Sequence, residues 1–419
     1  MRESRPGGFL RFAGAVGLAN TADGIAIVVW AWTATLLTRD PLLIALLPAA
    51  LRVPWVVFAL PSGILADRAD RRRLIVTCDL VRAGAYTLAG AAILSGLPLA
   101  DPARTGVSNS GVYVVLLGLG FVIGSAEVAR DNAAQTLLPS IIPPGRLEQA
   151  NGRLHGIEII GNSMIGPAMG SFLIAFFLPL PFFVVALAFL SAALAICTLA
   201  GRFQAEGRAT RPWRQELRDG FRHVLGQPML RTMVLITGFW NFFAEMALIG
   251  LVLHIQENLG AGATTYGLIL AGGAVGGVIG GAIVVPLLKR VPRGRLANCM
   301  NVAAAPLFVA VAAAPGPLTV GAAMFFFYLS GVIWNTLSIS YRQRVVPDRL
   351  RGRVNSVYRL FAWGMMPMGL IASGLVVRGM ENITDRNTAL LSPFLVAALG
   401  IGIVALLSWR PLNRGFVAE

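Results

Sequence analysis

The sequence predicts an all-α membrane protein with twelve transmembrane helices arranged as two halves of six. Hydrophobic residues make up 56% of the 419-residue chain and charged residues only 13%, whereas a soluble domain carries about 25% charged residues. The apolar residues form runs of about 20 residues, the length that crosses a bilayer as a helix. The basic residues collect in short segments between these runs, which is typical of a chain that crosses a membrane repeatedly.

Twelve apolar runs define the expected spans, and prolines mark many of their ends. Proline is tolerated there because the first backbone N–H groups of a helix have no partner within it. The expected spans cover residues 9–37, 42–66, 74–98, 112–137, 149–177, 182–201, 230–256, 265–288, 296–314, 317–340, 354–378 and 389–409.

The positions of the basic residues predict the orientation of the chain. Alternate segments, beginning with the N-terminus, hold most of the arginines, whereas the remaining segments hold only Arg39, Arg104, Arg378 and Arg386. Cytoplasmic loops retain Arg and Lys because their translocation is unfavourable. We therefore expect both termini in the cytoplasm (N-in/C-in). Except for Lys289 the basic residues are arginines, a usage that favours a bacterial protein and hence a multi-pass protein of the cytoplasmic (inner) membrane.

The longest segment between spans predicts the division into domains. It contains Trp213, Leu217 and Phe221 at helical spacing, with arginines on another face, as in an amphipathic helix that lies along a membrane surface. We expect a six-helix bundle over 1–201, a cytoplasmic linker over 202–229 and a second bundle over 230–419. Two such pseudo-symmetric bundles enclose the substrate site of many transporters near the midplane.

The segment between the second and third spans carries a recognisable motif, Gly63-Ile-Leu-Ala-Asp67-Arg68-Ala-Asp70-Arg71-Arg72. It resembles the signature Gly-x-Leu-Ala-Asp-Arg-x-Gly-Arg-Arg of the major facilitator superfamily, with Asp70 in place of the usual glycine. The resemblance implies the major facilitator fold. It also implies that Asp67, with Asp131 as a further acid, holds the start of the eleventh span when the cytoplasmic side is closed, because a carboxylate is stabilised at a helix N-terminus. The alternative is a basic loop that only sets the topology.

Further stretches resemble the drug- and siderophore-export branch of this superfamily, which includes macrolide and tetracycline exporters, Tap-type multidrug pumps and the enterobactin exporter. These stretches are residues 52–55, 79–82, 150–153, 166–170 and 350–354. The resemblance implies a monomeric secondary active exporter of amphipathic small molecules, such as antibiotics, that works by proton antiport and alternating access. The alternative is export of an endogenous metabolite such as a siderophore.

Four acids within spans are the candidates for proton coupling: Asp23, Glu127, Glu158 and Glu245. An ionisable group in a span is unfavourable and usually faces a cavity or a partner. Burial favours the neutral acid and a nearby arginine favours the carboxylate, so such an acid can exchange a proton. Asp23 is the strongest candidate, and the alternative is a fixed structural pair between Asp23 and Arg52.

Three arginines within or near spans, Arg52, Arg130 and Arg359, are expected to tune these acids or to contact an anionic substrate. Arg130 resembles an arginine of the fourth span that relays protons in related antiporters, although the Arg-x-x-Gln-Gly sequence of those proteins is absent here. Asp79 and Arg82 lie one turn apart and are expected to pair with the loop motif.

Glycines and aromatic residues complete the expected site. Gly166, Pro167 and Gly170 resemble the antiporter motif of the superfamily, which favours antiport over uniport. Aromatic side chains can stack on bulky solutes, although most of them pack in cores or face lipid. The expected cavity residues are Asn20, Trp30, Trp240, Asn241, Phe243 and Trp334.

Other functional classes find little support. Cys78, Cys197 and Cys299 are isolated, and no metal-ligand spacing or nucleophile–base set is present, so neither a metal site nor an enzyme is expected. No nucleotide-binding sequence occurs, and we expect the proton gradient, rather than a cofactor, to supply the energy. The arginines form no continuous face, which argues against nucleic acid. The expected partners are a small-molecule substrate, protons and the lipid bilayer.

Overall fold

A computed structural model describes residues 6–143, 146–199, 201, 203 and 213–417. Over this part of the chain the secondary structure is helical, apart from an isolated bridge between Thr38 and Ala103. Twelve helices among the described residues are long and apolar enough to cross a membrane. The predicted all-α fold with twelve spans is therefore confirmed.

The described residues divide into two compact units. The first unit lies within Met1–Ala209 together with Tyr266–Ala271, and the second lies within Thr210–Thr265 and Gly272–Glu419. Each unit is described by itself below.

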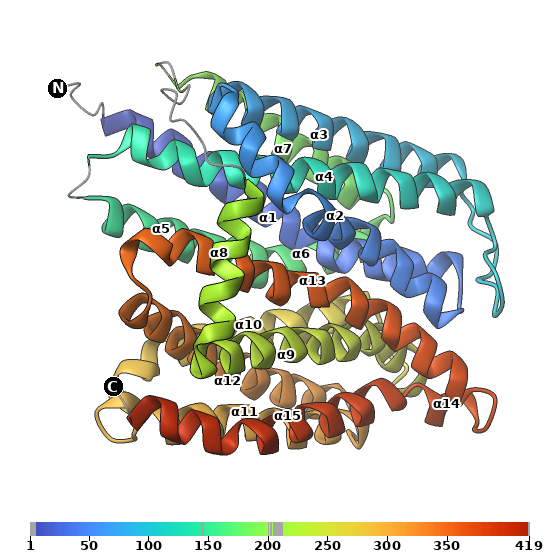
Figure 1. Cartoon of the computed structure of the whole chain (residues 1–419). Coiled ribbons are helices and arrows are strands. Elements are labelled where there is room, and N and C mark those ends of the chain that lie inside the picture. Colours follow the sequence, from blue (N-terminus) through green and yellow to red (C-terminus); the bar gives the residue numbers. More distant parts are fainter. Residues whose placement is uncertain (1–5, 144–145, 200, 202, 204–212, 418–419) are drawn as a thin grey trace. The chain divides into compact units, whose positions relative to one another are not determined.

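The first unit contains six spans, whose ends fall within a few residues of those expected (Figure 1). They are α1 (Pro6–Leu37), α2 (Pro41–Arg68), α3 (Arg71–Ser95), α4 (Ser110–Ile141), a fifth span formed by α5 (Leu147–Glu158), the π-helix η2 (Ile159–Ile165) and α6 (Gly166–Phe176), and finally α7 (Leu180–Cys197).

Side-chain caps explain where three of these helices begin. The carboxylates of Asp40 and Asp70 and the side-chain oxygen of Asn109 each accept a hydrogen bond from a backbone N–H in the first turn of α2, α3 and α4, respectively. Such caps satisfy N–H groups that have no partner within the helix. Asp70, which departs from the superfamily motif, thus has a clear role as the N-cap of α3.

In the first unit α3 makes its main contacts with two helices. It contacts α4 on one side and α7 on the other, while α1 packs against α7 and α6 (Figure 1). The Tyr86 ring of α3 stacks on Phe189 of α7 with 5.8 Å between centroids, and the Trp30 indole of α1 meets Tyr86 edge-on. These rings form the buried centre of the unit and fix the faces that α1 and α3 present to one another.

The fifth span is interrupted where it approaches α1. A Cβ atom at Gly166 would lie 2.5 Å from Cα of Gly24, and one at Gly24 would lie 2.3 Å from the carbonyl oxygen of Asn162. Only glycine allows the two backbones to approach so closely, as small residues do in membrane helix pairs. The sequence-predicted antiporter motif therefore lies at this contact, directly after a π-helical segment, a form that is rare and often functional.

The second unit contains the remaining spans and the helix that precedes them. Its elements are α8 (Trp213–Gly226), α9 (Pro228–Leu253), which continues as the π-helix η3 (His254–Asn258), α10 (Ala263–Leu288) except for Tyr266–Ala271, α11 (Arg293–Ala312), α12 (Pro317–Val345), α13 (Asp348–Met380), α14 (Arg386–Ala389) and α15 (Ser392–Val417).

The amphipathic segment forms α8, and its second half packs on α13 (Figure 1). The Phe221 ring lies 6.2 Å from that of Phe361, Val224 is buried, and Asp219 forms an ion pair of 2.9 Å with Arg353. Along this half, the apolar side of α8 therefore contacts protein, whereas the sequence predicted a helix lying along a lipid surface.

Candidate functional site

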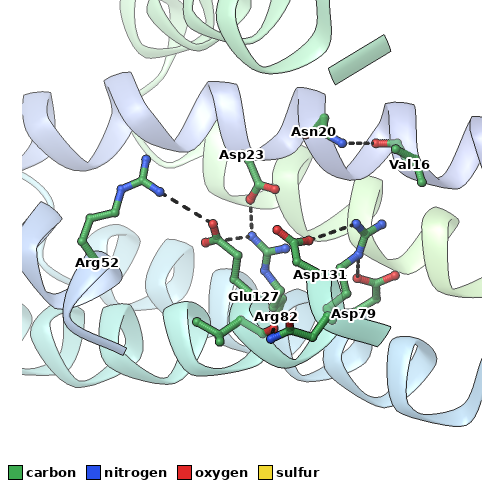
Figure 2. A network of polar contacts seen from close by, with 11 residues as sticks. Val16, Asn20, Asp23, Arg52, Asp79, Arg82, Glu127 and Asp131 are labelled. Atoms are coloured by element: carbon green, nitrogen blue, oxygen red, sulfur yellow. Dashed lines mark hydrogen bonds and ion pairs between the residues drawn. The ribbon is translucent and has the colours of Figure 1, made fainter. Parts of the chain in front are cut away.

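Helices α1 to α4 bring together a charge network inside the first unit (Figure 2). Among the described residues it contains four carboxylic acids and three arginines: Asp23, Asp79, Glu127, Asp131, Arg52, Arg82 and Arg130. All seven lie within helices. Most basic residues of the chain, by contrast, lie at or beyond the ends of the spans.

Arg82 of α3 is the centre of the network. Its side chain is 0% exposed, and its guanidinium lies 3.9 Å from the centroid of the Phe189 ring. Nη2 donates a hydrogen bond to the Asp23 carboxylate and lies 3.7 Å from Oε2 of Glu127. One nitrogen therefore faces acids from both α1 and α4.

Glu127 also faces Arg52 of α2, with 3.7 Å between Oε1 and Nη1. The close approach of α2 and α4 explains this placement, because a Cβ atom at Gly124 would lie 2.2 Å from the carbonyl oxygen of Leu51. Gly124 precedes Glu127 by one turn, and Leu51 precedes Arg52 by one residue. A glycine contact thus brings the two charged side chains within reach of one another.

Arg130 of α4 holds the second pair of acids. Its Nε donates to Oδ1 of Asp79 at 3.2 Å, and its Nη1 lies 3.4 Å from Oδ1 of Asp131. Asp79 is 0% exposed, whereas Asp131 is 37% exposed. The buried acid therefore depends on Arg130, while the other acid is partly solvated.

The ion pairs of the network differ from the alternative pair between Asp23 and Arg52 that the sequence suggested. Asp23 pairs with Arg82 instead of Arg52, and Arg52 lies beside Glu127. Among the described residues, Asp79 contacts Arg130 on α4 and Arg82 contacts the acids of α1 and α4, and the expected pairing with the loop motif stays a prediction because the side chains of Asp67 and Arg68 lie outside the described residues. Arg82 was absent from the expected site. Its signal in the sequence, an arginine one turn after an aspartate within an apolar span, pointed to a buried charge but not to its partner.

The loop motif is only partly described. The backbone of α2 continues to Arg68, but the surroundings of Gly63 and the side chains of Asp67 and Arg68 lie outside the described set. Arg71 donates to the Thr136 carbonyl at 3.1 Å and Arg72 to the Leu199 carbonyl at 2.6 Å. These bonds connect the start of α3 to α4 and to the residues just after α7. The gate itself stays a prediction.

The other predicted ionisable residues lie outside the charge network. Glu158 is 57% exposed and lies 3.5 Å from His155 one turn before it. Glu245 of α9 interacts electrostatically with Tyr328 of α12. The Arg359 guanidinium stacks over the ring of Trp363, 4.2 Å from its centroid. The last two residues belong to the second unit.

The residues predicted for the substrate cavity make contacts within their own units. Asn20 donates to the Val16 carbonyl of its own helix at 2.9 Å (Figure 2), and Trp30 is buried in the first unit. Within the second unit, Asn241 donates to the Ala362 carbonyl at 2.7 Å, and the indole of Trp334 donates to Thr237 at 3.3 Å.

The two remaining aromatic candidates pack tightly in the second unit. The Trp240 ring is parallel to Phe327, with 4.6 Å between centroids, and the Phe243 ring fills the space that a Cβ atom at Gly400 would need. These contacts give the rings a packing role, and their part in a substrate cavity stays a prediction. Among the described residues, no group of three His, Cys, Asp or Glu side chains is placed to hold a metal ion.

The fold is shared with known membrane transporters. The structure is similar to a mutant of the nucleoside transporter NupG, with a TM-score of 0.76 and 13% identity over 96% of this chain and 99% of that one. It is also similar to a bacterial homologue of the human lysosomal transporter Spinster, with a TM-score of 0.70 and 15% identity over 100% of this chain and 97% of that one. A bacterial homologue of the iron transporter ferroportin gives a TM-score of 0.69 and 17% identity over 95% of this chain and 98% of that one. The chain therefore shares the fold of these transporters.

The sequence identifies the family to which the chain belongs. Residues 11–411 match the family described as transmembrane secretion effector, and the chain belongs to this family of major facilitator superfamily transporters. A comparison with curated proteins found no match. The expected drug- and siderophore-export branch therefore stays a prediction.

Proposed function

We propose that this transporter exports an amphipathic small molecule across the bacterial inner membrane in exchange for protons. The observation that carries the proposal is the charge network, which places four carboxylic acids and three arginines of the described chain within one bundle of spans.

The charge balance of this network supports a proton-carrying role. With every group ionised, the seven described side chains carry one negative charge in excess, and uptake of one proton makes the set neutral. Uncompensated charge is unfavourable within a span. Because proton binding removes that excess charge, it favours whichever conformation buries the network more completely.

The direction and the substrate rest on other observations. The family description names secretion, which favours outward transport, and the arginine distribution favours cytoplasmic termini. The solved structures of similar fold include a nucleoside transporter and a homologue of an iron transporter, so the fold does not select a substrate. Resemblance to the drug-export branch favours antibiotics or cationic dyes. The reference to secretion also favours a second candidate, an endogenous product such as a siderophore.

Drug susceptibility of a pump-deficient bacterial host tests the main proposal. Cells expressing the protein should gain several-fold resistance to at least one class among tetracyclines, macrolides, aminoglycosides, phenicols and cationic dyes. Asp23→Asn should abolish this resistance at equal membrane abundance, because it removes a charge from the network. Asp101→Asn is the matched control, since Asp101 is exposed outside the spans, and it should keep the resistance.

Two results would contradict the proposal. Full resistance with Asp23→Asn would show that this acid has no part in coupling. Absence of resistance with both the native and the variant protein would exclude these drug classes and favour the endogenous product, which a comparison of exported metabolites would then identify.

A further inference from the structure

Arg82 contacts both of its acidic partners through one nitrogen atom, Nη2. Both Asp23 and Glu127 lie at Nη2, whereas Nε and Nη1 are buried without a hydrogen-bond partner in the described chain. The Phe189 ring covers one face of the guanidinium. Because the side chain is fully buried, its charge is available to these two acids rather than to solvent.

The two acids are not held equally. Asp23 accepts a hydrogen bond from Nη2. The oxygens of Glu127 lie 3.7 Å from Arg82 and 3.7 Å from Arg52, which is longer than a hydrogen bond. Among the described residues, no hydrogen bond to the Glu127 carboxylate is formed, and this side chain is only 15% exposed. Hydrogen bonds to a carboxylate stabilise its ionised form, so the ionised form is better supported at Asp23 than at Glu127.

Charged and titratable groups surround Glu127 from every helix that packs on α4. They comprise Asp23 from α1, Arg52 from α2, and Cys78, Asp79, Arg82 and Tyr86 from α3, while α4 itself adds Arg130 and Asp131. Asp79 is held by Arg130, and Asp131 is the most exposed acid of the set. Glu127 is therefore the buried acid of the network with the weakest support for its negative charge.

We propose that Arg82 is the positioning residue of the proton site: it holds Asp23 ionised and leaves Glu127 as the acid that takes up the exchangeable proton. The step adds one proton from water to one carboxylate oxygen of Glu127 and is reversed by its release. No other bond changes. This inference deepens the proposed function and rests on it for its biological meaning, but its test needs no transported solute.

Infrared titration of the purified full-length protein in detergent tests the assignment. The carbonyl absorption of protonated carboxylic acids should include a buried component that disappears as the pH is raised. Glu127→Gln should remove this component. Asp23→Asn should keep it but move its midpoint to lower pH, since Arg82 is then free to hold Glu127 ionised.

Variants of Arg82 separate a positioning role from a merely structural one. Arg82→Gln should move the midpoint to higher pH, by about one to three units for the loss of an adjacent opposite charge. Arg82→Lys, which keeps the charge, should stay closer to the native value. In the double variant Arg82→Gln/Glu127→Gln a buried component should reappear, because Asp23 has lost the partner that kept it ionised.

The opposite pattern would overturn the inference. If Asp23→Asn removed the component and Glu127→Gln left it unchanged, Asp23 would be the proton carrier. If Arg82→Gln fails to fold, as judged by gel filtration and thermal unfolding, the Asp23 and Glu127 variants still decide the assignment. Failure of the proposed function is distinguishable, since absent drug resistance with the expected infrared pattern would leave the proton site intact and exclude only the solute.

Discussion

At the scale of single residues, the network is arranged as two arginines that each serve two acids. Arg82 faces Asp23 and Glu127, and Arg130 faces Asp79 and Asp131. Within each pair one acid makes the shorter contact with the arginine, Asp23 with Arg82 and Asp79 with Arg130, and the other acid makes a longer one. We infer that Asp23 and Asp79 hold the two arginines in place. The contacts and the protonation of Glu127 and Asp131 can then change more easily.

This division predicts unequal effects on stability. Asp79→Asn removes the partner of a buried guanidinium, and breaking a buried pair in this way costs about 3–5 kcal/mol. Asp131→Asn alters a partly exposed contact, for which about 0–1 kcal/mol is typical. Thermal unfolding of the purified variants should therefore show a large decrease for Asp79→Asn and a small one for Asp131→Asn. Equal decreases would contradict the proposed division.

Several charged residues of the site could be predicted from sequence, but the central role of Arg82 and the partners of these residues could not. Asp23, Glu127 and Arg130 stand out because each interrupts an apolar run. The contact between Arg82 and Asp23 depends on how α3 packs between α4 and α7, and on the aromatic contacts of Trp30 and Tyr86 that orient α1. Residue spacing along one helix contains no information on that packing.

At the scale of elements, glycine contacts determine how the charged helices approach one another. Gly124 brings α4 against α2 beside Arg52, and Gly24 brings α1 against the fifth span one residue after Asp23. The acid of α1 and the π-helix η2 thus lie on neighbouring parts of one contact. A shift of the fifth span along α1 would therefore move the backbone next to Asp23. In this way a movement at Gly166, Pro167 and Gly170 could change the contacts of the charge network.

Gly166→Ala tests the importance of this contact. The new methyl carbon would lie 2.5 Å from Cα of Gly24, so the two backbones would have to separate, and overpacking of this kind costs about 1–3 kcal/mol. The variant should unfold at a lower temperature than the native protein. Gly156→Ala is the matched control, because nothing lies within 4 Å of the added carbon. An unchanged unfolding temperature for Gly166→Ala would show that the contact is not tight.

The same element also shows a limit of sequence analysis. The run of residues 149–177 predicts one span, and its length is correct. Its division into α5, η2 and α6 follows from the close contact with α1 and from Pro167, which removes a backbone donor just after the π-helix. Such local changes of helical form depend on tertiary contacts, which periodicity does not record.

At the scale of the whole molecule, the number of spans and the superfamily were predictable, because both depend on local sequence. Apolar length defines a span, and the 63–72 motif defines the resemblance. The transported solute was not predictable, since transporters of the same fold carry different cargoes. The central claim concerns coupling: export should depend on protonation of the charge network, with Glu127 as the acid that changes its charge.

Proton movement in everted membrane vesicles tests this claim most directly. Respiration acidifies the vesicle lumen, and a pH-sensitive dye reports the gradient. Addition of a compound from the drug class to which the protein confers resistance should discharge part of that gradient in vesicles with the native protein, because each exported molecule is exchanged for protons. Vesicles with Glu127→Gln at equal abundance should show no discharge. Equal discharge in both, or transport of the compound by the native protein without any discharge, would contradict the account.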